Sequence, residues 1–163
     1  KAVSNDRLIE ELKFFDMDLS HHPKRTELLD LSKQRAQTLV EMKKSITDIL
    51  DVPSFYEESG VKKFVKEDTK AFLEKYINLL EKNKDDLYDV TKVEDITKPF
   101  IAENGLKFPQ LFQPIRIALT GGTQAPSVYD IIAILGFNEV SARLKEALKR
   151  NFQNTWLFNN NLA

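Results

Sequence analysis

The spacing of apolar residues constrains the fold of this chain more than any other feature of its sequence. Apolar side chains recur at intervals of three and four residues along nearly the whole chain, and the period-two alternation of strands is hard to find. Only 5 glycines and 6 prolines interrupt the 163 residues. This pattern predicts an all-α fold built from packed amphipathic helices.

Breaks in the pattern divide the predicted helices into two groups. We expect one helix over residues 4–19 and a long one over residues 24–50, before a proline and a glycine interrupt residues 52–60. The sequence therefore predicts two packed helical subdomains, over residues 1–58 and 59–163.

The second group contains shorter predicted helices around an acidic run. Residues 81–95 carry a net charge of −3, which indicates a solvated connector. Thr91 and Glu94 form a capping-box pattern, and Gly136 suits the end of a helix. An extension begins at about residue 151, and its four large apolar side chains indicate that it docks onto the domain. The predicted helices cover residues 64–80, 92–104, 109–119, 127–135 and 138–150.

Composition excludes several classes of protein. The chain has no cysteine, so it has no thiol nucleophile, disulfide or Cys-ligated metal. A net charge of −1 argues against a protein that coats nucleic acid indiscriminately. No apolar run approaches the roughly 18 residues that cross a bilayer, so we expect a soluble, cytoplasmic protein without a membrane partner. Because the chain starts at Lys1 rather than Met, we also expect a piece of something longer.

No catalytic centre or metal site is predicted. His21 and His22 are adjacent, so they cannot share one helix face as a metal pair at i and i+4 would, and Pro23 marks the stretch as a helix end. Carboxylates that follow one another on a helix point in different directions, whereas acid–base catalysis needs two that converge. Glu10-Glu11, Glu57-Glu58 and Asp85-Asp86 are examples of such pairs.

The Gly121-Gly122 loop resembles a phosphate cradle only superficially. It lacks the lysine and hydroxyl residue of a nucleotide-binding P-loop, and no predicted strand precedes it. We interpret it as a turn between helices. The helix start after Pro126 would still present backbone N–H groups to an anion or a base edge, and that alternative stays open.

Three cations lie on or beside apolar helix faces. Arg35 falls on the apolar stripe of the helix predicted over residues 24–50, where its guanidinium must reach solvent, pair with an acid, or face a cleft whose ligand pairs it. Arg116 and Lys98 lie at the edges of two other apolar faces. The segment from Lys98 to Tyr129 carries a net charge of +2, which by itself does not establish a nucleic-acid site.

A specific motif lies between residues 109 and 148. It reads Pro-x-Arg-x-Ala-x-Thr-Gly over residues 114–121, then Pro126, then Leu-Gly at 135–136, and Arg-Leu-x-x-Ala-Leu over 143–148. This run closely resembles the C-terminal signature of bacterial glutamyl-tRNA synthetases, and the resemblance continues more weakly and colinearly from Lys1 to about Gly105.

The resemblance implies the anticodon-binding region of a class I synthetase, an all-helical body of two packed subdomains without the nucleotide-binding catalytic domain. Arg35 falls where the family has the arginine that reads the third anticodon base. Arg116 falls on a second base-reading arginine. Lys98 replaces a further arginine, which keeps the charge but loses the planar fork. The loop that contacts anticodon bases matches at Ala125, Pro126 and Val128, and Ala125 lacks the hydroxyl of the threonine found in relatives.

The resemblance further implies that this region binds tRNA-Glu as a monomer and does not bind DNA, with tRNA-Gln as an open second ligand. ATP and Mg²⁺ would serve the parent ligase, while the fragment itself would use no cofactor and make no glutamyl-adenylate. Glutamate and glutamine anticodons differ in the third letter, C against G, and an arginine fork matches the acceptors of cytosine. The competing hypothesis is a helical protein-interaction scaffold, suggested by the apolar tail and the acidic connector.

Overall fold

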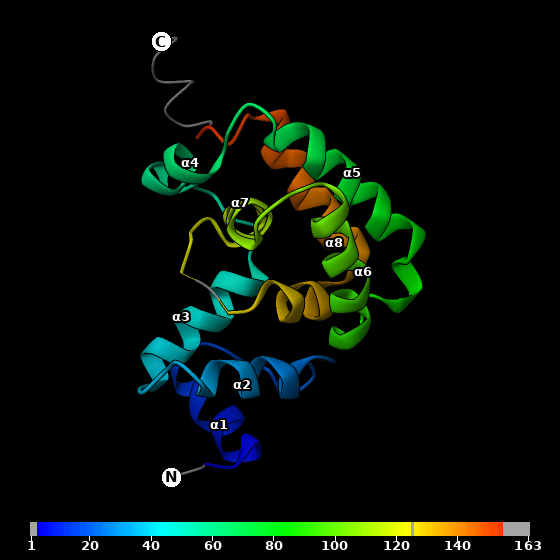
Figure 1. Cartoon of the computed structure of the whole chain (residues 1–163). Helices are drawn as coiled ribbons and strands as arrows, with labels where there is room; N and C mark the ends of the chain where they lie inside the picture. The colour runs from blue at the N-terminus through cyan, green and yellow to red at the C-terminus, as the bar shows by residue number, and fades with distance from the viewer. Residues whose placement is uncertain (1–2, 125, 155–163) are drawn as a thin grey trace. The chain divides into compact units, whose positions relative to one another are not determined.

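The computed structural model of the chain describes residues 3–124 and 126–154, and every regular element in these ranges is a helix (Figure 1). The all-α prediction is confirmed. The chain divides into two compact units, Lys1–Asp51 and Val52–Ala163. This division comes earlier than the predicted boundary after residue 58, and the assignment of subdomain functions stays a prediction.

The first unit is built from short helices around a small apolar core. Asp16 has a left-handed φ of 62° just after the 3-10 helix, so the helix predicted over residues 4–19 ends early. The elements are α1 (Asn5–Leu12), the 3-10 helix η1 (Lys13–Phe15), α2 (Arg25–Lys33) and α3 (Leu39–Leu50). Their fully buried side chains include Leu12, Leu28, Leu29, Ile46 and Ile49.

The single helix predicted over residues 24–50 is wrong, because the chain leaves the helical conformation between α2 and α3. The Thr38 hydroxyl accepts the N–H of Glu41 at 3.1 Å, and the Glu41 carboxylate accepts the N–H of Thr38 at 3.2 Å. This capping box starts a new helix by pairing N–H groups that a continuous helix would have bonded internally. Arg35 consequently lies exposed in the turn before Thr38, and not on an apolar stripe.

The second unit is organised around α7. Figure 1 shows α7 nearly end-on between α4 and α8, and it packs on α8, α4 and α5. Its residues Leu111, Ile115, Ile117, Ala118 and Leu119 are fully buried. The elements are α4 (Glu58–Phe64), α5 (Thr69–Lys82), the 3-10 helix η2 (Lys84–Asp86), α6 (Val90–Glu103), α7 (Phe108–Thr120) and α8 (Val128–Lys149).

Two predictions for this unit are wrong, because local hydrogen bonds cap the helices at other residues than expected. The helix predicted over residues 64–80 is split between α4 and α5, where the Thr69 hydroxyl accepts the N–H of Lys66 at 2.8 Å. The expected capping box at Thr91 is also wrong: Asp89 caps α6 and accepts the N–H of Thr91 at 2.9 Å. The acidic connector is not wholly solvated, because Leu87 within it is fully buried.

The predicted helix break at Gly136 is confirmed. Its φ of 81° and ψ of 171° are non-helical and interrupt α8. This region of backbone conformation is occupied almost exclusively by glycine. The ring of Tyr88 also lies against this position, with its hydroxyl oxygen 2.7 Å from where a Cβ would stand.

The predicted docking of the tail is confirmed for its described part. Phe152 is 3% exposed, and its ring lies 5.8 Å from that of Tyr56. The Asn154 side chain accepts the N–H of Tyr56 at 2.6 Å and donates to its carbonyl at 3.1 Å. These contacts fix the chain just before α4 in the second unit. Trp156, Leu157 and Phe158 lie outside the described residues.

Replacing Gly136 with alanine tests the break in α8. We expect Gly136→Ala to lower the free energy of unfolding by about 1–3 kcal/mol, because the backbone conformation at this position is one that residues with a Cβ avoid. Urea denaturation monitored by circular dichroism measures the change. Tyr88→Ala, alone and combined with Gly136→Ala, separates backbone strain from contact with the ring. Unchanged stability of the single glycine variant would contradict this account.

Candidate nucleic-acid interface

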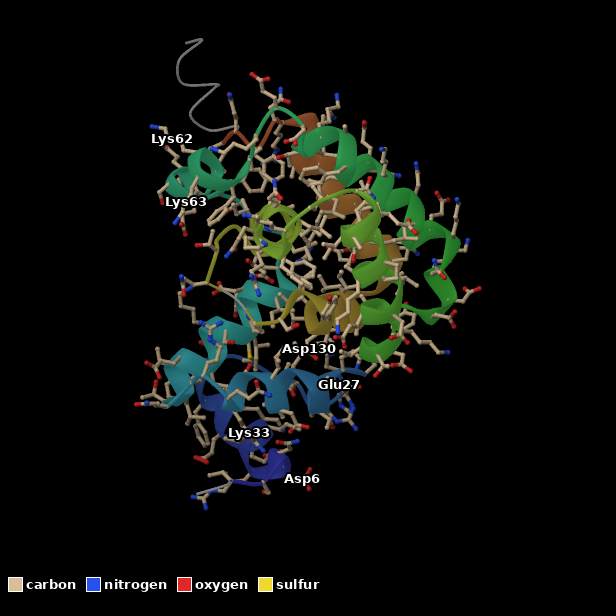
Figure 2. All side chains as sticks on the ribbon, viewed as in Figure 1. Asp6, Glu27, Lys33, Lys62, Lys63 and Asp130 are labelled. Carbon is tan, nitrogen blue, oxygen red and sulfur yellow. The ribbon has the colours of Figure 1, made fainter. Side chains whose placement is uncertain are left out.

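The second unit brings four of the predicted site residues to one place, here called the α6–α7–α8 junction. Lys98 lies on α6 and Arg116 on α7, while Pro126 and Val128 lie at the start of α8, which Asp130 marks in Figure 2. The link between α7 and α8 is direct, because Arg116 Nε lies 3.5 Å from the carbonyl oxygen of Pro126. The half-buried guanidinium therefore reaches the loop that carries the predicted base contacts.

Lys98 is a paired cation at the surface of this junction. Its Nζ lies 2.5 Å from a carboxylate oxygen of Glu94, one turn earlier on α6. The hydrogen bond and the charge of Glu94 raise the pKa of Lys98. Tyr129 is close by: burial raises the pKa of its hydroxyl, the charge of Glu94 raises it further, and Lys98 lowers it. The ammonium therefore stays charged, but an incoming phosphate must compete with Glu94.

Aromatic side chains cover the adjoining face. Phe108 and Phe112 lie one turn apart on α7 with ring centroids 5.5 Å apart, and Phe112 meets Tyr129 edge-on at 5.2 Å. Arg116 follows one further turn along α7, so the rings and the guanidinium share one helix face. The spacing of Phe108 and Phe112 is that of an apolar helix face, but Phe108 is 48% exposed.

Among the described residues, the hydroxyl oxygen of Tyr129 at the junction is buried and has no hydrogen-bond partner. A buried polar group without a partner costs about 1–3 kcal/mol of stability.

The loop between α7 and α8 is held on one side by the segment before α4. The N–H of Glu57 donates to the carbonyl of Gly121 at 2.7 Å, and the hydroxyl of Thr123 lies 3.4 Å from the Glu57 carboxylate. Gly121 has a φ of 90°, and a Cβ there would stand 2.5 Å from the carbonyl oxygen of Phe55. Only glycine allows this close approach.

Arg143 of α8 holds the end of α7 from the other side. The side chain is 2% exposed, its Nε lies 2.8 Å from the Glu139 carboxylate, and its Nη1 donates to the carbonyl of Leu119 at 2.9 Å. That carbonyl belongs to the last turn of α7, where the helix leaves acceptors without internal donors. Arg143 therefore fixes the point from which the loop begins.

The remaining predicted residues differ in how they can act. Val128 is 2% exposed, so almost none of its surface is available to a ligand. Ala125 lies outside the described residues. Arg35 belongs to the first unit, in the exposed turn between α2 and α3. The base-reading roles of all six residues stay predictions.

Sequence reasoning missed Arg143 and the aromatic cluster. Arg143 was noted only as part of the motif. Glu139, four residues earlier, is the sequence feature that could have indicated an ion-paired guanidinium there. The spacing of Phe108 and Phe112 is also typical of residues that pack in a core. Contact between Phe112 and Tyr129 depends on how two helices pack, which periodicity does not reveal.

Residues 3–124 and 126–154 contain neither a candidate metal-binding cluster nor a candidate membrane span. His, Asp and Glu side chains in these ranges form no group of three that could hold a metal ion. His22 instead accepts the N–H of Lys24 at 3.0 Å, as a turn residue does. No helix in the same ranges has the length and hydropathy needed to span a bilayer.

Comparison with known proteins gives a consistent result. The family described as "Anticodon binding domain" matches residues 7–148. The chain is 76% identical to glutamate–tRNA ligase 1 of Aliarcobacter butzleri over 155 residues, which are 95% of this chain and 33% of that ligase. It is 38% identical to glutamate–tRNA ligase 1 of Campylobacter hominis over 149 residues, 91% of this chain and 32% of that ligase. The chain thus spans about a third of the length of these relatives.

A solved structure has the same fold. A glutamate tRNA ligase from Elizabethkingia meningosepticum, crystallised with its amino acid, matches with a TM-score of 0.80 over 90% of this chain and 29% of that one, at 18% identity. At this level of identity the likeness supports the fold.

Arg143→Met tests the anchor at the end of α7. We expect the free energy of unfolding to fall by about 2–4 kcal/mol, because the Leu119 carbonyl loses a buried donor and the methionine leaves part of the site empty. Arg150→Met is the matched control, since Arg150 forms a similar pair with Glu146 at 2.7 Å but is 29% exposed. Arg150→Met should lower the free energy of unfolding by about 1 kcal/mol or less. Equal losses in urea denaturation would show that Arg143 is an ordinary helix ion pair.

Proposed function

Because this chain belongs to the anticodon-binding domain family, we propose that it is the anticodon-recognition region of a glutamate–tRNA ligase and that its ligand is the anticodon loop of tRNA-Glu. The observation that carries the proposal is the α6–α7–α8 junction. There the matched family segment places Arg116 against the Pro126 carbonyl and Lys98 near Tyr129. Cations on rigid helices beside a fixed loop are suited to unstacked bases, whose edges and phosphates are both accessible.

The proposal extends to the longer protein. Attachment of glutamate to tRNA would need ATP and Mg²⁺ in a catalytic domain that this chain does not contain, so the chain alone should be inactive. We propose a cytoplasmic monomer that binds tRNA and not DNA or membranes. Whether tRNA-Gln is a second ligand depends on the third anticodon base.

Both units take part in the proposal. The proposed functional subdomains are residues 1–58 and 59–163, whereas the chain divides into compact units after Asp51. In this proposal, the second unit contacts the loop through Arg116, Lys98 and the segment Ala125 to Val128. The first unit contributes Arg35 to the third base.

Arg116→Ala tests the junction. We expect binding of a tRNA-Glu anticodon stem-loop to weaken by about 1–3 kcal/mol, with a shallower salt dependence, because a guanidinium contact is lost. Fluorescence anisotropy at several salt concentrations measures both quantities. Lys62→Ala is the control, because Lys62 is exposed on α4, away from Asp130 within the same unit in Figure 2. Failure of the unaltered chain to bind tRNA even at low salt would favour the scaffold hypothesis instead.

Arg35→Gln tests recognition of the third base. Its exposure in the turn before Thr38 leaves the side chain accessible to RNA. The variant should lose about 1–3 kcal/mol of binding free energy for a stem-loop whose anticodon ends in C. It should bind a stem-loop whose anticodon ends in G about as well as the original chain does. Arg25 is an exposed arginine at the start of α2. The control variant Arg25→Gln should leave the ratio of the affinities for the two stem-loops unchanged. A ratio that is the same for the original chain and Arg35→Gln would exclude this role for Arg35.

A further inference from the structure

The aromatic cluster of Phe108, Phe112 and Tyr129 forms a continuous ladder that ends at the surface. The ring planes of Phe108 and Phe112 are tilted by 41°, and those of Phe112 and Tyr129 by 82°. Both geometries are favourable contacts between aromatic rings. Tyr129 and Phe112 are half-buried, and Phe108 at the outer end is 48% exposed. The inner rings therefore support the outer one, and part of the outer ring is not covered by the protein.

The backbone beneath the outer ring is fixed. Gln110 accepts the N–H of Lys107 through its side-chain oxygen at 2.7 Å, which closes the first turn of α7. Pro109 in this turn has a restricted φ, which favours the helix start. Phe108 is thus held at a defined position by its helix and by Phe112, so little conformational entropy remains to be lost when a ligand covers it.

Charge indicates what kind of ligand suits this surface. Lys107 is exposed and immediately precedes Phe108, Arg116 lies two turns away on the same helix, and Lys98 is close enough to Tyr129 to lower the pKa of its hydroxyl. A planar apolar surface among cations matches an unpaired nucleobase with its phosphates. It is less suited to an apolar peptide, whose neutral backbone would gain nothing from the cations.

We propose that the exposed face of Phe108 is a stacking platform for one unpaired base of the bound RNA, with Phe112 and Tyr129 as its support. This inference rests on the proposed function and adds a contact of a different kind. Stacking accepts any base, because every base has a π-face. Phe108 would therefore contribute affinity and fix the path of the loop, while the arginines read base edges.

Replacement of Phe108 distinguishes an aromatic role from a merely apolar one. Phe108→Leu keeps apolar bulk but removes the ring, so we expect affinity for the tRNA-Glu anticodon stem-loop to fall about 5- to 100-fold without a change in salt slope. Phe108→Trp should bind within about twofold of the original chain, since stacking is retained. Phe14→Leu is the control, because Phe14 is 87% exposed in the first unit, and it should bind unchanged.

Abasic nucleotides placed singly around the loop identify the stacked base. One abasic position should weaken binding of the original chain and have no further effect on Phe108→Leu, as a double-mutant cycle requires for a direct contact. The proposal is overturned if Phe108→Leu binds normally, if Phe108→Trp binds as weakly as Phe108→Leu, or if no loop position shows this coupling. Absence of RNA binding by the original chain would instead overturn the proposed function itself, together with the platform.

Discussion

The pairing of one buried guanidinium supports the geometry of the whole junction. Arg143 is almost completely removed from water, so it must be paired, and its partners include Glu139 and the carbonyl of Leu119 at the end of α7. Arg143 belongs to the part of α8 that follows the Gly136 break, whereas Val128 begins the same helix. One helix therefore starts at the loop and also anchors the helix that precedes the loop.

The second support of the loop comes from the part of the chain between α3 and α4. Tyr56 is bound through its backbone by Asn154, and the next residue, Glu57, donates to the Gly121 carbonyl. Asn154 lies beyond residue 148, where the family match ends. A residue outside the shared family region thus helps to hold a loop inside it. The loop depends on packing between segments that are far apart in sequence, which is why its motif alone does not describe its surroundings.

The class of fold and the family were accessible from sequence, whereas side-chain environments were predictable only in part. Helical periodicity and the Gly136 break depend on local conformational preferences, and both predictions hold. The prediction for Arg35 was wrong because the apolar residues before position 34 and after position 38 keep the spacing of one continuous helix. The capping box formed by Thr38 and Glu41 nevertheless separates two helices there. The exposure of Phe108 could not be read from its spacing, because exposure depends on which helices cover that face of α7.

The charges at the junction suggest how a chain with a net charge of −1 can bind RNA. Lys98 is already paired with Glu94, so a phosphate gains this cation only by displacing a half-buried carboxylate, an exchange with little net gain. Few counterions would be released, and the salt dependence of binding would be shallow. In the proposed complex, affinity would come mainly from contacts that do not depend on net charge: guanidinium hydrogen bonds to base edges and stacking on an aromatic ring. Both require bases that are already unpaired, so an anticodon loop would be favoured over the far more abundant helical RNA.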